Sequence, residues 1–201
     1  MPEVIIFDLG GVLIDWNPRY LYRKIFLTEE SIDNFLSNIC TSEWNEMQDA
    51  GRSFEEGTRV VKGQFPEYYT EIQCFYDRWE EMLGGSIDEM VEHLYWVKEN
   101  TDCRIIALTN WSKESFPIAL KKFDFLSLFE GILVSGEEGI AKPNPKIYEL
   151  LLNRYGINRE KALFIDDNLR NVQAALSVGL PSYHHKDVEA TIHFVKQQFT
   201  T

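Results

Sequence analysis

The chain opens with the stretch Val4-Ile5-Ile6-Phe7-Asp8-Leu9-Gly10-Gly11-Val12, which decides its fold. The run of β-branched and aromatic residues predicts a buried strand over residues 4–8. The two glycines that follow let the backbone turn sharply. An acid at the carboxyl end of a first parallel strand lies where open α/β sheets bind their ligands. Asp8 is therefore a candidate site residue, although an aspartate in this position can also do no more than cap a turn.

Beyond residue 100 the chain alternates strictly between strands and helices. Further strands are predicted over residues 104–109, 131–135, 162–166 and 180–183. Asn144 and Pro145 begin one of the helices between them, Gly156 ends it, and a last helix covers residues 187–199. Apolar strands separated by helices predict a parallel sheet covered on both faces, to which the first strand belongs.

The intervening region is predicted to be helical, with no strand between residue 16 and about residue 100. Helices are expected from Pro18, over residues 29–39, and over residues 67–83, where Gly84-Gly85 would end the helix. Ser53 and Ser86 each begin a capping box. The sequence thus predicts an α/β protein, with a Rossmann-like core of residues 1–15 and 100–201 and an inserted α-helical cap of residues 16–99. The many aromatic residues of the cap are expected to form its core, and a few of them to line a substrate pocket.

Composition limits the classes of function. The 201 residues are 44% hydrophobic and 26% charged, as is ordinary for a soluble globular protein. The formal net charge of −12 argues against nucleic acid as a partner. No apolar run approaches the ~20 residues of a membrane span, and no signal peptide is evident. The three separated cysteines predict reduced thiols in a cytoplasmic protein, with a monomer as the default.

Polar residues follow four of the predicted strands, and a parallel sheet would gather them at one edge. They are Asp8, Thr109-Asn110, Lys142-Pro143 and Asp166-Asp167-Asn168. Carboxylates from the first and fourth of these strands can hold Mg²⁺, a cation that prefers oxygen ligands. Asp8 can also serve as a nucleophile that forms an aspartyl-phosphate. The metal and Lys142 would offset the charge of a phosphate, while Thr109 and the backbone near Asn110 could donate hydrogen bonds to it.

The chain resembles the haloacid dehalogenase-like (HAD) hydrolase superfamily, in the subgroup with a helical cap after the first strand. Four ordered motifs carry the resemblance: Asp8-Leu9-Gly10-Gly11-Val12, Leu108-Thr109-Asn110, Lys142-Pro143 and Phe164-Ile165-Asp166-Asp167-Asn168. The resemblance implies that Asp8 attacks phosphorus and that Thr109 and Lys142 hold the phosphoryl group. It implies that Asp166 and Asp167 hold Mg²⁺ together with Asp8, and it places Asn110 against the substrate. The implied activity is that of a phosphatase for small phosphorylated metabolites, with sugar phosphates as one candidate.

One position departs from the family pattern. Family phosphatases usually carry a second aspartate, the general acid and base, two residues after the nucleophile, and here that residue is Gly10. A glycine cannot donate a proton, although its backbone carbonyl could still bind Mg²⁺. Losing such a group typically costs ~10²–10⁴-fold in rate, and Asp15 is the nearest carboxylate that could replace it. A first motif with this glycine resembles bacterial sugar-phosphate phosphatases.

Two other functions stay open at this stage. In a dehalogenase the same aspartate would displace halide from carbon, which the missing acid and the Asn110-Trp111-Ser112 triplet favour. That reaction needs no metal, however, and its enzymes lack paired acids like Asp166-Asp167. The third alternative is a catalytically weak binding protein that has kept the fold. The cap residues that face the substrate, near Trp44, Glu46 or Arg52, are not settled by the sequence.

Overall fold

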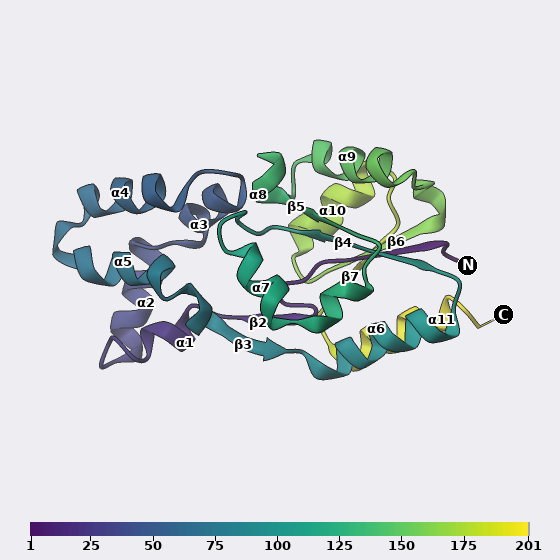
Figure 1. Cartoon of the computed structure of the whole chain (residues 1–201), viewed down its shortest axis with the longest axis horizontal. Helices are drawn as coiled ribbons and strands as arrows, with labels where there is room; N and C mark the ends of the chain where they lie inside the picture. The colour runs from purple at the N-terminus through teal and green to yellow at the C-terminus, as the bar shows by residue number, and fades with distance from the viewer. Residues whose placement is uncertain (201) are drawn as a thin grey trace.

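A five-stranded parallel sheet forms the centre of the computed structural model, which describes residues 1–200 (Figure 1). Its strand order is β5-β4-β1-β6-β7, which matches an α/β fold. The predicted strands are confirmed to within two residues at each end. Their bounds are β1 Val4–Phe7, β4 Arg104–Thr109, β5 Gly131–Val134, β6 Ala162–Asp166 and β7 Ser182–His184.

Helices cover both faces of the sheet, as the apolar strands predict. Val4 and Ile6 point to one face, which packs against α9 (Pro145–Tyr155) and α10 (Leu169–Ser177). Ile5 and Phe7 point to the other face and pack in a second core. The helices over this face are α6 (Asp88–Asn100), α7 (Phe116–Lys122) and α11 (Val188–Gln197). The short elements α8 (Ser135–Glu138), η3 (Asp124–Leu128) and η4 (Arg159–Lys161) complete this part of the chain.

Local sequence signals explain where α9 begins and ends. The Asn144 side chain accepts a hydrogen bond from the backbone N–H of Lys146, and Pro145 occupies the first turn. Gly156 ends the helix in the left-handed conformation, with φ of 59°. These features confirm the helix predicted between Asn144 and Gly156, which leads the chain back from the edge of the sheet where Asp8 lies.

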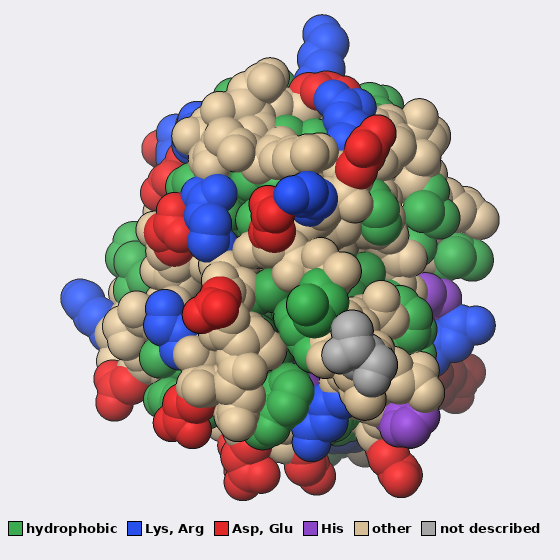
Figure 2. Space-filling view, turned by 90° about the vertical axis from the view of Figure 1, so that its right-hand side faces the viewer, with side chains coloured by type: hydrophobic (Ala, Val, Ile, Leu, Met, Phe, Trp, Pro, Cys, Tyr) green, Lys and Arg blue, Asp and Glu red, His purple; other side chains and the backbone are tan. Residues whose placement is uncertain are grey.

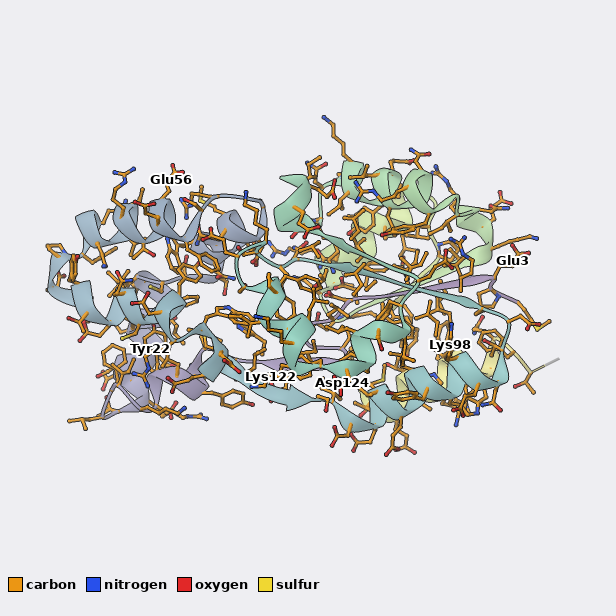
Figure 3. All side chains as sticks on the ribbon, in the orientation of Figure 1. Glu3, Tyr22, Glu56, Lys98, Lys122 and Asp124 are labelled. Carbon is orange, nitrogen blue, oxygen red and sulfur yellow. The ribbon has the colours of Figure 1, made fainter. Side chains whose placement is uncertain are left out.

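Apart from α6, the predicted helices of the intervening region lie together at the end of the molecule opposite the two termini (Figure 1). They share the apolar core that covers one face of the sheet, and Tyr22 packs on Phe35 with ring centroids 4.7 Å apart. Figure 3 shows Tyr22 among these helices and Glu3 at the far end of the molecule. The elements are α1 Arg19–Tyr22, α2 Glu29–Asn38, α3 Ser42–Asp49, α4 Phe54–Gln64, η1 Pro66–Tyr68, α5 Tyr69–Asp77 and η2 Trp79–Met82.

Three details of this region differ from the sequence prediction. The helix expected over residues 67–83 is divided into η1, α5 and η2. The prediction of no strand was wrong, because β3 (Leu83–Ser86) pairs antiparallel with β2 (Ile14–Trp16). Gly84 belongs to β3 and does not end a helix. A glycine is required there because a Cβ would overlap the Asp15 carboxylate. The Ser53 side chain caps α4 by accepting from the backbone N–H of Glu56, but Ser86 makes no cap to α6.

Charged side chains of both signs are interspersed at the surface near the termini, which Figure 2 shows. Several of them form exposed ion pairs, such as Lys161 with Glu3 and Arg104 with Glu130. Within residues 1–200, no helix has the length and apolar character that crossing a membrane requires.

Candidate active site

The carboxyl ends of three neighbouring strands bring the predicted site residues together. Asp8 follows β1, Thr109 ends β4 and Asp166 ends β6, and β1 lies between β4 and β6. Because the three strands are parallel, their ends meet at the same edge of the sheet. The backbone N–H of Asp8 still donates to the carbonyl of Ile165, at 2.9 Å, so Asp8 is held firmly in the sheet.

Lys142 joins two of these strand ends. Its side chain is fully buried, and its Nζ lies 2.9 Å from Asp8 Oδ1 and 2.7 Å from Asp166 Oδ2. The third donor position is filled by the carbonyl of Leu108, at 2.9 Å. The ammonium is therefore fully hydrogen-bonded without water. Burial disfavours its charge, but Asp166 and Asp8 raise the pKa of Lys142 above its ordinary value, so it stays protonated.

The two adjacent acids have different surroundings. Both oxygens of Asp166 accept from Asn171 Nδ2, at 3.1 Å, and Oδ1 also accepts from the backbone N–H of Asn168. With Lys142 as a further partner, this buried carboxylate is fully engaged. Asp167 lies on the wall of a cavity, against Gly11, with its side chain partly open to solvent and partly desolvated. Asp166 therefore positions Lys142, whereas Asp167 has oxygen atoms free for a ligand.

The donor set suits a hard divalent cation. Oxygen atoms of Asp8, Asp166 and Asp167 lie within 4.8 Å of one another. Burial raises the pKa of Asp8 well above its ordinary value, the single charge of Lys142 offsets this in part, and Asp166 and Asp167 raise it further. Burial and the charge of Asp166 also raise the pKa of Asp167. An additional cation would stabilise the ionised carboxylates, and Mg²⁺ prefers such ligands.

The two polar residues of the second motif, Thr109 and Asn110, differ in whether their side chains have hydrogen-bond partners. Thr109 is buried, and its Oγ1 has no hydrogen-bond partner within residues 1–200. The amide of Asn110 is occupied, since its Nδ2 donates to the carbonyl of Lys142 and its Oδ1 accepts from the backbone N–H of Lys142, both at 2.8 Å. Thr109 thus has a hydroxyl without a protein partner in the described part of the chain, whereas the Asn110 side chain holds the loop that carries Lys142.

A cavity of about 230 Å³ opens beside Asp8 and Asp167, between the sheet edge and the helical region. Its walls include Gly10 and Asn110 from the sheet edge. Most of its other lining residues could not be predicted from the sequence. In full, these other residues are Gly11, Trp16, Asn45, Asp49, Phe54, Tyr76, Trp79, Trp111, Ser112 and Ser115. The aromatic richness of residues 16–99 was the one signal that pointed to them.

The cap residues singled out by the sequence lie outside the cavity lining. The Arg52 guanidinium is held by Gln48 Oε1, at 2.5 Å, and by the carbonyl of Trp44. Glu46 pairs with Arg170, at 2.7 Å. Asp15, considered above as a replacement acid, accepts a 2.6 Å hydrogen bond from the Tyr20 hydroxyl and does not line the cavity.

Direct contacts fasten the helical region over the sheet edge. Ser135 Oγ donates to the carbonyl of Asp49, at 2.5 Å, and the backbone N–H of Phe54 donates to Glu114 Oε1, at 2.8 Å. The pair of Arg170 with Glu46 adds a third contact. These contacts set the side chains of α3 and α4 opposite Asp8, so the cavity has one wall from each part of the chain.

Comparison with known proteins identifies a matching family and several relatives. A family model described as haloacid dehalogenase-like hydrolase matches residues 2–179. A sesquiterpene phosphatase of Aspergillus oryzae is 27% identical over 195 residues, covering 97% of this chain and 95% of that protein. A phosphorylated carbohydrates phosphatase of Thermotoga maritima is 25% identical, covering 89% of this chain and 82% of that protein.

Solved structures share the fold. A HAD family enzyme of Bacteroides thetaiotaomicron, crystallised as a variant with magnesium and inorganic phosphate, superposes with a TM-score of 0.71. The match covers 92% of this chain and 95% of that one, at 20% sequence identity. At this identity the likeness concerns the fold.

We predict that Lys142→Met destabilises the protein strongly. The change leaves Asp8 and Asp166 buried without their shared cation, and removing one partner of a buried pair typically costs about 3–5 kcal/mol. Urea unfolding in the presence of EDTA measures the free energy of unfolding. The matched control is Lys161→Met, which removes an exposed pair with Glu3 and should cost less than about 1 kcal/mol. Equal losses for the two variants would contradict a central role for Lys142.

Proposed function

The chain belongs to the haloacid dehalogenase-like hydrolase family, and from this premise we propose that it is a Mg²⁺-dependent phosphatase. In this proposal it hydrolyses small phosphate monoesters through an aspartyl-phosphate on Asp8. The observation that carries the proposal is the buried ion cluster, in which Lys142 joins Asp8 to Asp166 while the Asp167 carboxylate stays free at the cavity. Two relatives bear the name of phosphatases, which supports the same reaction class.

Each residue of the cluster has a proposed task. Asp8 attacks phosphorus, and its position at the end of β1 aims its carboxylate at the cavity. The positive charge of Lys142, whose three donor positions stay with Asp8, Asp166 and the Leu108 carbonyl, would offset the charge that develops on the phosphoryl oxygens. The unpartnered hydroxyl of Thr109 is proposed to hold one of these oxygens. Asp166 keeps Lys142 in place, and the Asn110 side chain fixes the loop of Lys142. Mg²⁺, held by Asp8, Asp167 and the backbone carbonyl of Gly10 with Asp166 behind them, would neutralise the phosphate dianion.

Of the residues 16–99 expected to form a cap on a core of residues 1–15 and 100–201, we propose that the elements from α1 to η2 act as the cap, because α6 covers the sheet of the core. Its contacts through Asp49, Phe54 and Glu46 bring α3 and α4 over the strand ends. Closing the cap would exclude water from the reacting group and strengthen the electrostatic interactions there. The enzyme is proposed to work as a cytoplasmic monomer, consistent with its unpaired Cys40, Cys74 and Cys103.

The charges of the cavity argue against a haloacid substrate. Its charged lining residues are Asp8, Asp49 and Asp167, and among the described residues no Lys, Arg or His joins them. Such a wall offers no cationic side chain to the carboxylate of a haloacid. A phosphate dianion faces the same negative wall, but the proposed Mg²⁺ compensates for it. The arrangement therefore favours the phosphatase over the dehalogenase.

The cavity surface favours an alcohol with an apolar or aromatic group. Phe54 and Tyr76 stack with ring centroids 3.7 Å apart, and Trp79 lies near Trp111. Most polar lining groups already bond to protein. Ser115 Oγ, for example, accepts from Trp111 Nε1. A sugar phosphate would find few free partners in this wall. We therefore rank aromatic and terpenoid phosphates above sugar phosphates in a substrate panel.

We predict that Asp8→Asn abolishes phosphatase turnover, because an amide cannot attack phosphorus. Release of p-nitrophenol from p-nitrophenyl phosphate measures the activity, and urea unfolding checks that the variant is folded. EDTA should abolish the activity of the unaltered protein, and excess Mg²⁺ should restore it. Wild-type turnover by the folded variant would refute the mechanism. Halide release from 2-chloropropionate in the presence of EDTA would favour the dehalogenase function. If the protein shows neither phosphatase nor dehalogenase activity, the result would favour the binding-protein function.

We predict that Gly11→Ala weakens the use of Mg²⁺. Gly11 has φ of 74°, and a Cβ there would overlap the Asp167 carboxylate and push it from its position. The Mg²⁺ concentration for half-maximal activity should rise by about tenfold or more. Gly63→Ala is the matched control, because a Cβ at Gly63 meets no atom within 4 Å. An unchanged Mg²⁺ dependence in Gly11→Ala would contradict the proposed role of Asp167.

A further inference from the structure

The strand-end residues leave the proposed reaction without a proton donor. Gly10 has no side chain, and the Asp15 carboxylate is bound by Tyr20 outside the cavity. Asp166 is buried and fully hydrogen-bonded, and Asp8 and Asp167 are committed to attack and to the metal. An alcohol that leaves from phosphorus needs a proton, and the water that follows must lose one.

Asp49 is the remaining carboxylate of the cavity. It is the last residue of α3, and it lines the same cavity as Asp8 and Gly10 but belongs to the helical wall. Asn45 Nδ2 donates to its Oδ2, at 3.1 Å, and the backbone N–H of Ser112 also donates to the carboxylate. Its own carbonyl accepts from Ser135. The carboxylate is thus fixed by partners from the helical wall and from the loop after β4.

The surroundings of Asp49 suit proton transfer near neutral pH. Burial and, to a smaller extent, the charge of Glu46 on the same helix raise the pKa of Asp49 to about 7, against the opposing effect of the Ser112 N–H. The Tyr76 hydroxyl of α5 is the other titratable group beside it, and burial raises the pKa of that phenol well beyond its ordinary value. Tyr76 therefore stays neutral, and Asp49 is the group that titrates.

We propose that Asp49 is the general acid and base of this enzyme, in place of the carboxylate that Gly10 lacks. The inference rests on the proposed phosphatase function. In the first step Asp8 bonds to phosphorus, the bond from phosphorus to the alcohol oxygen breaks, and the Asp49 proton moves to that oxygen. In the second step water bonds to phosphorus, its proton returns to Asp49, and the bond between phosphorus and Asp8 breaks. Phosphate leaves, and both carboxyl groups are restored.

The structure also explains how an enzyme with Gly10 can tolerate this arrangement. A Cβ at Gly10 would meet no heavy atom within 4 Å, so the space beside Asp8 is open toward the cavity. Substrate can occupy that space and bring its leaving oxygen toward α3. The same open space provides a test, because it can accept an aspartate side chain.

The test uses Asp49→Asn in the full chain with two aromatic esters. On 2-phenylethyl phosphate, whose alcohol leaves poorly, kcat should fall by ~10²–10⁴-fold. On p-nitrophenyl phosphate, whose phenolate needs no proton, the first-turnover burst of p-nitrophenol should keep its wild-type rate while later turnovers slow. Above pH of about 7 the wild-type rate on the alkyl ester should fall as Asp49 loses its proton, and the variant should lack this limb.

Controls separate chemistry from folding. Asp15→Asn carries the same change outside the cavity and should behave as wild type on both esters. Adding Gly10→Asp to Asp49→Asn should restore turnover on 2-phenylethyl phosphate. The role of Asp49 would be overturned if Asp49→Asn kept the kcat of the wild-type protein on that ester. It would also be overturned if the burst rate and the steady turnover fell equally on both esters. Either result would leave the phosphatase function intact. Absence of Mg²⁺-dependent phosphate release by the unaltered protein would instead overturn both.

Discussion

A single ammonium group, the Nζ of Lys142, joins two carboxylates that lie out of solvent. Removing three charged groups from water is costly, and the cluster is stable only because every donor position of the ammonium is filled. This constraint fixes the ends of β1 and β6 relative to the loop that precedes α9. It also explains why both the Nδ2 and the Oδ1 of Asn110 form hydrogen bonds with the backbone of Lys142. The geometry of the site follows from this one interaction.

The same interaction leaves the site with more acids than bases. Lys142 offsets the charge of Asp166, while Asp8, Asp167 and Asp49 face the cavity. Each of these three carboxyl groups has a pKa raised first of all by burial. Asp8 and Asp167 lie close enough to share a divalent cation. Asp49 lies on the opposite wall of the cavity and is not part of this metal-binding group. Similar groups can thus serve as nucleophile, metal ligand and proton donor, because their surroundings differ.

The sequence was sufficient to predict those parts of the site that depend on regular structure. Buried strands carry a strong periodic signal, and the residue after a parallel strand has a known place, so Asp8, Thr109 and Asp166 could be brought together without coordinates. The β2–β3 ribbon was missed because its pairing depends on a distant partner and on Gly84 fitting against Asp15. Asp49 was missed because nothing local marks it. Its importance arises only when α3 is packed against Ser112 and Ser135.

In the proposed reaction, phosphate is transferred to Asp8 before it reaches water. Rapid mixing of the protein with Mg²⁺ and radiolabelled p-nitrophenyl phosphate, followed by an acid quench and tryptic digestion, tests it most directly. We expect label on the peptide of residues 1–19, which contains Asp8, in an alkali-labile bond. In Asp49→Asn the amount of label should approach one phosphate per chain. Release of phosphate in a fast first turnover with no label on this peptide would contradict the account.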